Sequence, residues 1–211
     1  MSEHPTFEVL EGLRGCGKST VAPLLAAARG ALLVPTVPLL YQPLRRQVDL
    51  RGGVEARQCF YLSALFVAAE EIRHHLADGT SVVVESYFAR CLANHHSFGS
   101  RLGVMLPPDL PQPVTYHLVC AEDERQRRLA QRTKPVTRWD LLSEEAPEQI
   151  TAAYARFPMH RVDTTDRDPD CVVRAILGIG QEGDHRADTE PVGAHPHVLP
   201  SVLRHAEGNL R

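Results

Sequence analysis

The sequence is poor in lysine and in long apolar runs, and it carries no excess of positive charge. Only two of its 23 basic residues are lysines, Lys18 and Lys134, and the formal net charge of the 211-residue chain is −3. This balance predicts no nucleic-acid polymer as a partner and no attraction to an anionic membrane. No apolar run approaches the ~18 residues that a membrane-spanning helix needs. We therefore expect no membrane partner either.

Cysteine is present but lacks the spacing of a disulfide framework or of a zinc site. The five cysteines are odd in number, lie far apart along the chain and form no C-x-x-C pair. This usage fits a reducing compartment. The first ten residues also lack the basic region and the apolar stretch of a secretory signal. Both features predict a cytoplasmic protein.

The remaining composition is that of a globular domain followed by a polar segment. Hydrophobic residues make up 43% of the chain and charged residues 23%, which are ordinary values for a folded protein. The polar, proline-dotted sequence of 183–211 predicts a flexible C-terminal tail, with a short helix near 198–205. The histidines of this tail suggest either a solvated terminus or a metal-binding tract. We expect 1–182 to form one domain.

Apolar, β-branched runs alternate with segments of helical period. The runs predict strands at 6–13, 31–36, 81–86, 115–120 and 159–165. The periodic segments predict helices at 18–29, 54–78, 87–102, 121–132, 143–157 and 169–179. Such alternation predicts an α/β fold, a three-layer sandwich with a central parallel sheet of about five strands.

A glycine-rich loop lies where the first strand meets the first helix. Residues 12–19 read GLRGCGKS and fit the P-loop pattern G-x-x-x-x-G-K-[ST], a match that chance would give roughly once in a thousand such chains. Glycines let backbone N–H groups turn toward phosphate oxygens, and the helix that follows directs its positive end at the same anion. Lys18 would reach the β and γ phosphates, and the Ser19 hydroxyl would hold Mg²⁺. The predicted nucleotide-binding residues are Gly12, Arg14, Gly15, Cys16, Gly17, Lys18, Ser19 and Thr20.

The loop predicts that the chain has the P-loop nucleoside triphosphate hydrolase fold and binds a nucleoside triphosphate. Kinases, GTPase-like switches and mechanical ATPases share it, so the loop does not choose among them.

The segment VLEGLRGCGKST resembles the opening of thymidylate kinases and the related deoxynucleoside kinases, in which a Glu-Gly pair precedes the loop. The segment VVVESYFARCLANH resembles the Asp-Arg-Tyr or Glu-Arg-Ser element of these enzymes. The segments LPQPVTYHLVCAEDERQRRLAQR and AAYARFPMHRVDTTDRDPDCVVRAIL resemble their fourth strand with its lid and their closing element. The resemblance covers about 7–177, and only the loop is highly specific. It implies an ATP- and Mg²⁺-dependent kinase domain with an arginine-bearing lid around 125–140.

The resemblance also implies roles for single residues on the donor side. Glu85, at the end of the third strand, would hold Mg²⁺ through water or orient the accepting group, or would simply cap a loop. Arg128 and Arg132 share a helix face and would stabilise charge on the transferred group. The alternative for this pair is a solvated face on which Glu122 and Glu124 neutralise the arginines. Arg138 would belong to the same lid.

On the acceptor side, Tyr61 would stack on a base, or it would be a core residue of the long helix, and Phe60 is a weaker candidate for stacking. Arg57, one turn earlier, would contact the acceptor or lie on the helix surface. Arg90 would replace the family arginine that aligns with Ser86. Arg45 and Arg46 are further candidates for an acceptor phosphate.

The departures from the family pattern lie on the acceptor side. Arg14 stands where many thymidylate kinases have an Asp, Leu65 stands where an arginine reads the pyrimidine, and 35–38 lacks the family motif of the second strand. The resemblance therefore supports an ATP-dependent kinase but not dTMP as its acceptor. Arg14 favours an anionic acceptor, a nucleoside monophosphate or a nucleotide-like metabolite. The alternatives are a nucleoside or small-alcohol kinase with Glu85 as base, and an ATP-binding regulatory protein with a decayed acceptor site. Family members pair through their long helices, which suggests a homodimer.

Overall fold

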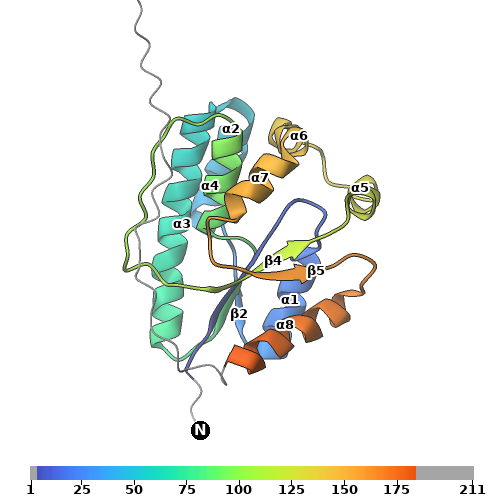
Figure 1. The fold of residues 1–211 in the computed structure, drawn as a ribbon. Coiled ribbons are helices and arrows are strands. Elements are labelled where there is room, and N and C mark those ends of the chain that lie inside the picture. The colour runs from blue at the N-terminus through green and yellow to red at the C-terminus, as the bar shows by residue number, and fades with distance from the viewer. Residues whose placement is uncertain (1–3, 184–211) are drawn as a thin grey trace, which may run out of the picture.

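The computed structural model describes residues 4–183, which fold around one parallel sheet (Figure 1). Within these residues the sheet has five strands in the order β2-β3-β1-β4-β5, and every neighbouring pair is parallel. The strands are β1 (Phe7–Glu11), β2 (Leu32–Val34), β3 (Val82–Val84), β4 (Val114–Val119) and β5 (His160–Asp163). The expected fold class, a three-layer α/β sandwich with about five parallel strands, is confirmed.

Helices cover both faces of the sheet, because the strands are apolar on both sides. The helices are α1 (Lys18–Arg29), η1 (Leu39–Tyr41), α2 (Gln42–Arg51), α3 (Val54–Ala77), α4 (Phe88–Ser97), α5 (Glu122–Ala130), α6 (Arg138–Glu145), α7 (Pro147–Tyr154) and α8 (Pro169–Gly183). Adjacent residues of β1 pack into the helical layers on opposite faces of the sheet. Leu10 packs among residues of α1 and α8, whereas Val9 packs among residues of α3 and α4.

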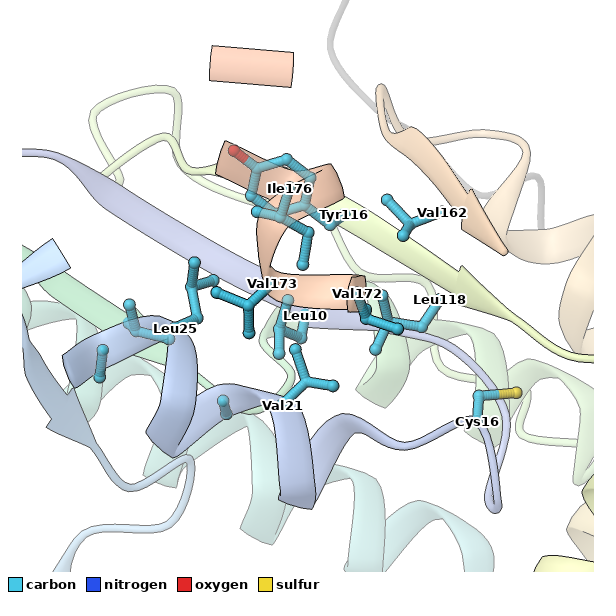
Figure 2. Packing of buried hydrophobic residues seen from close by; sticks show 13 residues of the cluster. Leu10, Cys16, Val21, Leu25, Tyr116, Leu118, Val162, Val172, Val173 and Ile176 are labelled. Atoms are coloured by element: carbon cyan, nitrogen blue, oxygen red, sulfur yellow. The ribbon is translucent and has the colours of Figure 1, made fainter. Parts of the chain in front are cut away.

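The layer of α1 and α8 packs beneath the glycine-rich loop of residues 12–19 and supports it. Figure 2 shows Leu10 of β1 beside Val21 and Leu25 of α1 and Val172 and Ile176 of α8. Burial of such side chains contributes about 1.5–3 kcal/mol each. This cluster therefore fixes the start of α1 relative to the end of β1, which is where the loop lies.

Several predicted elements are wrong in extent. The helix expected at 143–157 is two helices, because Pro147 begins α7 and cannot continue α6. The start of α6 also lies earlier than expected, at a capping box made by Thr137 and Asp140. The helix expected at 87–102 ends at Ser97, whereas α8 continues past the expected 179. The sequence reading missed α2, which buries none of its residues against the described chain and so has no apolar period to detect.

The predicted tail lies almost wholly outside the described residues, with its expected helix at 198–205 and its histidines, so the domain boundary stays a prediction. Among residues 4–183, no helix is both long and apolar enough to cross a membrane.

Candidate active site

A cavity of about 740 Å³ lies at the carboxyl ends of β1, β2 and β3, which is where ligands of open parallel sheets bind. Six residues predicted to bind the nucleotide line it, namely Arg14, Gly15, Gly17, Lys18, Ser19 and Thr20. The other predicted residues that line it are Arg57, Tyr61, Glu85, Arg90, Arg128 and Arg132. The fold thus brings residues from five segments of the chain to one place.

Two predicted loop residues lie behind the cavity wall. Cys16 is buried in the hydrophobic cluster under the loop, where burial raises the pKa of its thiol (Figure 2). Gly12 lies against β4, and a Cβ built on it would be 2.3 Å from the carbonyl oxygen of Leu118. These residues shape the loop and are not among the described residues that line the cavity.

The backbone of the predicted phosphate-binding loop has positive φ angles at three glycines. Gly12, Gly15 and Gly17 have φ angles of +137°, +84° and +94°, a region that glycine adopts without strain. Gly17 is the N-cap of α1, and no side chain of the described residues caps this helix. The first amides of α1 and the positive end of its dipole are therefore available to an anion in the cavity.

The ammonium group of Lys18 is held at the loop. Its Nζ atom donates to the carbonyl oxygens of Gly12 at 2.7 Å and of Leu13 at 2.8 Å. Burial lowers the pKa of Lys18 to about 8, and the nearby charge of Arg90 acts in the same direction. The group is still protonated at neutral pH and can neutralise a phosphate.

Arg125 of α5 fixes the loop from the side of the predicted lid, a role that the sequence reading missed. Its side chain is 1% exposed, and it pairs with Glu122 at 2.8 Å and with Glu144 at 2.7 Å. Its Nη1 atom donates to the backbone carbonyl of Arg14 at 3.2 Å. A Cβ on Gly15 would be 2.9 Å from the Cγ atom of Arg125. The loop therefore rests against a buried, fully paired guanidinium.

Arg14 is neutralised by the first two turns of α6. Its Nε atom lies 3.0 Å from the carboxylate of Asp140, and its Nη1 atom lies 3.7 Å from that of Glu144. The inference of an anionic acceptor from Arg14 alone therefore loses its support. Arg14 joins the loop to α6, although it still lines the cavity.

Ser19 and Glu85 supply oxygen donors suited to Mg²⁺. Both line the cavity, and neither side chain has a hydrogen-bond partner among residues 4–183. Mg²⁺ binds through one or two protein oxygens together with water and substrate phosphates. The same part of the chain contains no cluster of three or more His, Cys, Asp or Glu residues that could hold a metal alone. The donor set fits a magnesium ion that is bound together with a nucleotide.

The turn after β3 is strained. Ser86 has a φ angle of +79°, which costs a residue with a side chain about 1–2 kcal/mol. The Thr36 hydroxyl lies close to the carbonyl oxygens of both Glu85 and Ser86 and donates to them. Strain of this kind is common where a backbone is held in place for function.

We expect Ser86→Gly to raise the free energy of unfolding by about 1 kcal/mol, because glycine relieves the left-handed conformation. Thermal or urea unfolding measures this change. The Ser86 hydroxyl donates to the Leu10 carbonyl and accepts from Arg90, each at 3.4 Å. Destabilisation would mean that these hydrogen bonds outweigh the backbone strain.

Glu11 is a buried carboxylate at the end of β1 that the sequence reading left without a role. Its Oε1 atom accepts from the backbone N–H of Tyr87 at 2.8 Å and of Arg90 at 3.3 Å, so it caps the first turn of α4. Its Oε2 atom is buried without a partner among the described residues. Burial raises the pKa of Glu11 to about 7, against the opposing effect of the Tyr87 N–H.

We expect this pKa to appear in the pH dependence of stability. The folded protein holds the Glu11 proton up to about pH 7, while the unfolded chain releases it near its ordinary pKa of about 4.3. The Glu11 contribution to the free energy of unfolding is therefore greatest at low pH, and up to ~3 kcal/mol of it is lost as the pH rises from 4.5 to 7. Denaturant unfolding of the wild type and of Glu11→Gln at several pH values tests this. Parallel pH profiles for the two proteins would show that Glu11 is ionised throughout.

Of the two arginines predicted for the lid, the Arg128 side chain has partners among the described residues, whereas the Arg132 side chain has none among them. Arg128 pairs with Glu124 at 2.6 Å and donates to the carbonyl of Thr164 at 2.7 Å, so the predicted ion pair exists and the side chain also lines the cavity. Arg132 lines the cavity and forms no ion pair with any described residue. A second hollow of about 300 Å³ adjoins the loop and is lined by Gly17, Arg128, Thr164 and Arg167 among others.

Tyr61 and Arg57 form one cluster with Asp49 at the far end of the cavity. The Tyr61 hydroxyl donates to the Asp49 carboxylate at 3.0 Å, and the Nε atom of Arg57 donates to it at 2.9 Å. The Arg57 guanidinium lies over the Tyr61 ring, 4.4 Å from its centroid. Tyr61 also packs on the core cluster of α3 and α4. Tyr61 is therefore a core residue that also lines the cavity, and a face of its ring is in contact with an arginine. Its stacking on a base stays a prediction.

The other acceptor candidates divide into those inside and those outside the cavity. Arg45 lines it and approaches Asp49 at 3.8 Å. Arg46, Phe60 and Arg138 are not among its described lining residues. The Arg138 guanidinium instead donates to the carbonyl of Gly52 and lies over the Trp139 ring.

The sequence reading also missed His95 and Trp139. His95 is 1% exposed, and its ring lies between the carbonyl of Cys91, 2.7 Å from Nδ1, and the Nη1 atom of Arg57, 2.9 Å from Nε2. Trp139 donates from Nε1 to the carbonyl of Asp49 at 2.8 Å. The only sign of this cluster in the sequence is a pair of polar residues, Asn94 and His95, which lies one turn after Arg90.

No family model and no curated protein matches the chain. Among solved structures, the chain is similar to a thymidylate kinase from Candida albicans, whose substrate specificity is described as broad. The identity is 14%, the TM-score is 0.69, and the match covers 93% of this chain and 99% of that one. At this identity the likeness shows the fold, which is that of a thymidylate kinase-like P-loop protein.

Proposed function

We propose that the protein transfers the γ-phosphoryl group of ATP to a nucleoside monophosphate or a nucleotide-like metabolite. The observation that carries this proposal is the position of Lys18. Its buried ammonium is hydrogen-bonded to a loop of positive-φ glycines, in a cavity that is also lined by Glu85 and by three basic side chains, Arg90, Arg132 and Lys134, that form no ion pair with any described residue. The thymidylate kinase fold supports the same class of reaction.

The donor would bind at the loop. The first amides of α1 and Lys18 would bind its phosphates, and Ser19 and Glu85 would hold Mg²⁺, which neutralises developing charge in such transfers. Arg132 and Arg128 would stabilise the transferred group from the lid. The second hollow beside Gly17 and Arg128 would take the nucleoside part of the donor.

The acceptor would enter from the side of α2 and α3. Arg90 extends from the first turn of α4 into the cavity, 3.4 Å from the Ser86 hydroxyl, and it has no acidic side chain within ion-pair distance among residues 4–183. A phosphate on the acceptor would supply the negative charge that pairs with Arg90. With an alcohol as the acceptor, the unpaired carboxylate of Glu85 would act as the base, which defines the alternative of a small-alcohol kinase.

A coupled ADP-release assay over nucleoside monophosphates, nucleosides and small alcohols tests the proposal. We expect one acceptor class to raise turnover well above the rate without acceptor. Glu85→Gln should lower that turnover by about 10²-fold or more, whereas Glu148→Gln, an exposed carboxylate on α7, should leave it unchanged. Binding of MgATP with no acceptor-dependent turnover would instead support the regulatory protein.

A further inference from the structure

Arg57 is held in place from four sides by residues of α2, α3, α4 and α6. Its Nε atom donates a hydrogen bond to the Asp49 carboxylate, and its Nη1 atom donates one to the Nε2 atom of His95, each at 2.9 Å. Its guanidinium carbon lies over the rings of Tyr61 and Trp139, at 4.4 and 4.6 Å from their centroids. Cation–π contacts of this kind are favourable when the cation is withdrawn from water. The Arg57 side chain is 13% exposed.

One edge of this guanidinium is not used by the protein. No atom of the described residues accepts a hydrogen bond from Nη2 of Arg57, and the residue lines the cavity. A guanidinium presents a rigid fork of donors that matches the oxygens of a carboxylate or a phosphate. A fixed fork with an unused edge at a cavity wall is therefore suited to bind an oxyanion.

The charges around Arg57 do not balance. Arg57 and Arg45 share a single carboxylate, that of Asp49. His95 adds no negative charge, since its Nδ1 donates to the Cys91 carbonyl and its Nε2 accepts from Arg57. Burial, with the help of Arg57, lowers the pKa of His95 to about 4, so the ring is neutral. The far end of the cavity therefore retains one uncompensated positive charge.

The same contacts leave less room for a stacked base. In this structure a face of Tyr61 is covered by Arg57, and Asp49 holds the Tyr61 hydroxyl. The residues that line this end beside Arg57 and Tyr61 include Gln42, Arg45 and Asn94, whose side chains are polar. Recognition by hydrogen bonds and charge fits this wall better than recognition by stacking.

We propose that the acceptor carries a second oxyanion, remote from the atom that receives the phosphoryl group, and that Arg57 binds it. This inference rests on the proposed function and specifies its acceptor as a small dianionic or multiply anionic metabolite. Tyr61, Trp139 and His95 are positioning residues that act through Arg57.

Trp139 is the only tryptophan of the chain, and its ring contacts Arg57, so its fluorescence reports on this subsite. The full-length protein is first saturated with magnesium and a non-hydrolysable ATP analogue, and inorganic phosphate is then titrated while Trp139 emission is recorded. We expect a saturable change in the wild type. Arg57→Gln should weaken phosphate binding at least tenfold, and Arg57→Lys should restore it only in part, because lysine lacks the fork. Arg156→Gln, which changes an exposed arginine outside the cavity lining, should behave as the wild type.

Three results would overturn the inference. They are no saturable phosphate signal in the wild type, equal phosphate affinity in folded Arg57→Gln, and an Arg57-dependent signal produced by uncharged thymidine but not by phosphate. The first needs no variant, so it holds even if a substitution unfolds the protein. Failure of the ATP analogue to bind in the preceding step would instead contradict the proposed function.

Discussion

Replacing Lys18 by methionine is expected to lower acceptor-dependent turnover by about 10²–10³-fold, the usual effect of removing one donor that stabilises transition-state charge. Methionine keeps the aliphatic stem that fills the base of the loop but removes the ammonium, which bonds the carbonyls of Gly12 and Leu13. ADP release under saturating MgATP measures the effect.

The fold should tolerate this change. The Lys18 ammonium is desolvated, which lowers its pKa to about 8, and removing it also removes that unfavourable burial. We therefore expect the thermal midpoint of Lys18→Met to stay near that of the wild type. Unchanged turnover in a folded variant would contradict the role of the loop, and loss of folding would show that the ammonium is needed for structure.

Replacing Gly12 by alanine is expected to have the largest effect on stability. The added Cβ would lie 2.3 Å from the carbonyl oxygen of Leu118, a backbone atom, at a φ angle of +137°. Backbone strain of about 1–3 kcal/mol and a steric clash of similar size act together. A loss of roughly 4 kcal/mol in the free energy of unfolding is therefore expected, which urea unfolding measures.

Gly30→Ala is the matched control. Gly30 also has a positive φ angle, +60°, but a Cβ there would meet no atom within 4 Å. We expect a loss of about 1 kcal/mol, the cost of the left-handed conformation alone. Equal losses in the two variants would mean that the strand–loop junction moves easily to admit a side chain, and that the loop is not held by β4.

The donor side of the site could be predicted from the sequence because its residues are local. The loop and the start of α1 are consecutive, and the spacing of glycines, Lys18 and Ser19 determines the backbone geometry directly. The parallel sheet and its helical layers follow from the alternation of apolar runs and helical segments, whereas the strand order is known only from the structure. Glu85 was found because it ends a short apolar strand.

The contacts of the acceptor-side candidates could not be predicted because they join distant segments. The bond of Trp139 to the carbonyl of Asp49 spans 90 positions, and that of Arg57 to His95 spans 38. No periodicity marks such pairs. Arg14 shows the consequence, since its sequence position suggested a free charge beside the acceptor, whereas Asp140, at the start of a helix that was expected to begin later, neutralises it.

Glu11 is a third case, in which the sequence shows the residue but not that its carboxylate is buried. A glutamate before a glycine-rich loop reads as polar, yet β1 is buried over its whole length and the carboxylate is fully enclosed. Only the fold shows that it caps α4 and so places Arg90.

Calorimetric titration with a magnesium-bound, non-hydrolysable ATP analogue tests the central claim, that the loop of residues 12–19 binds a triphosphate. We predict one site per chain, weaker binding without magnesium, and at least a tenfold loss of affinity in Lys18→Met. The account would be contradicted by the absence of binding to the folded wild type, or by an affinity that neither magnesium nor Lys18 affects.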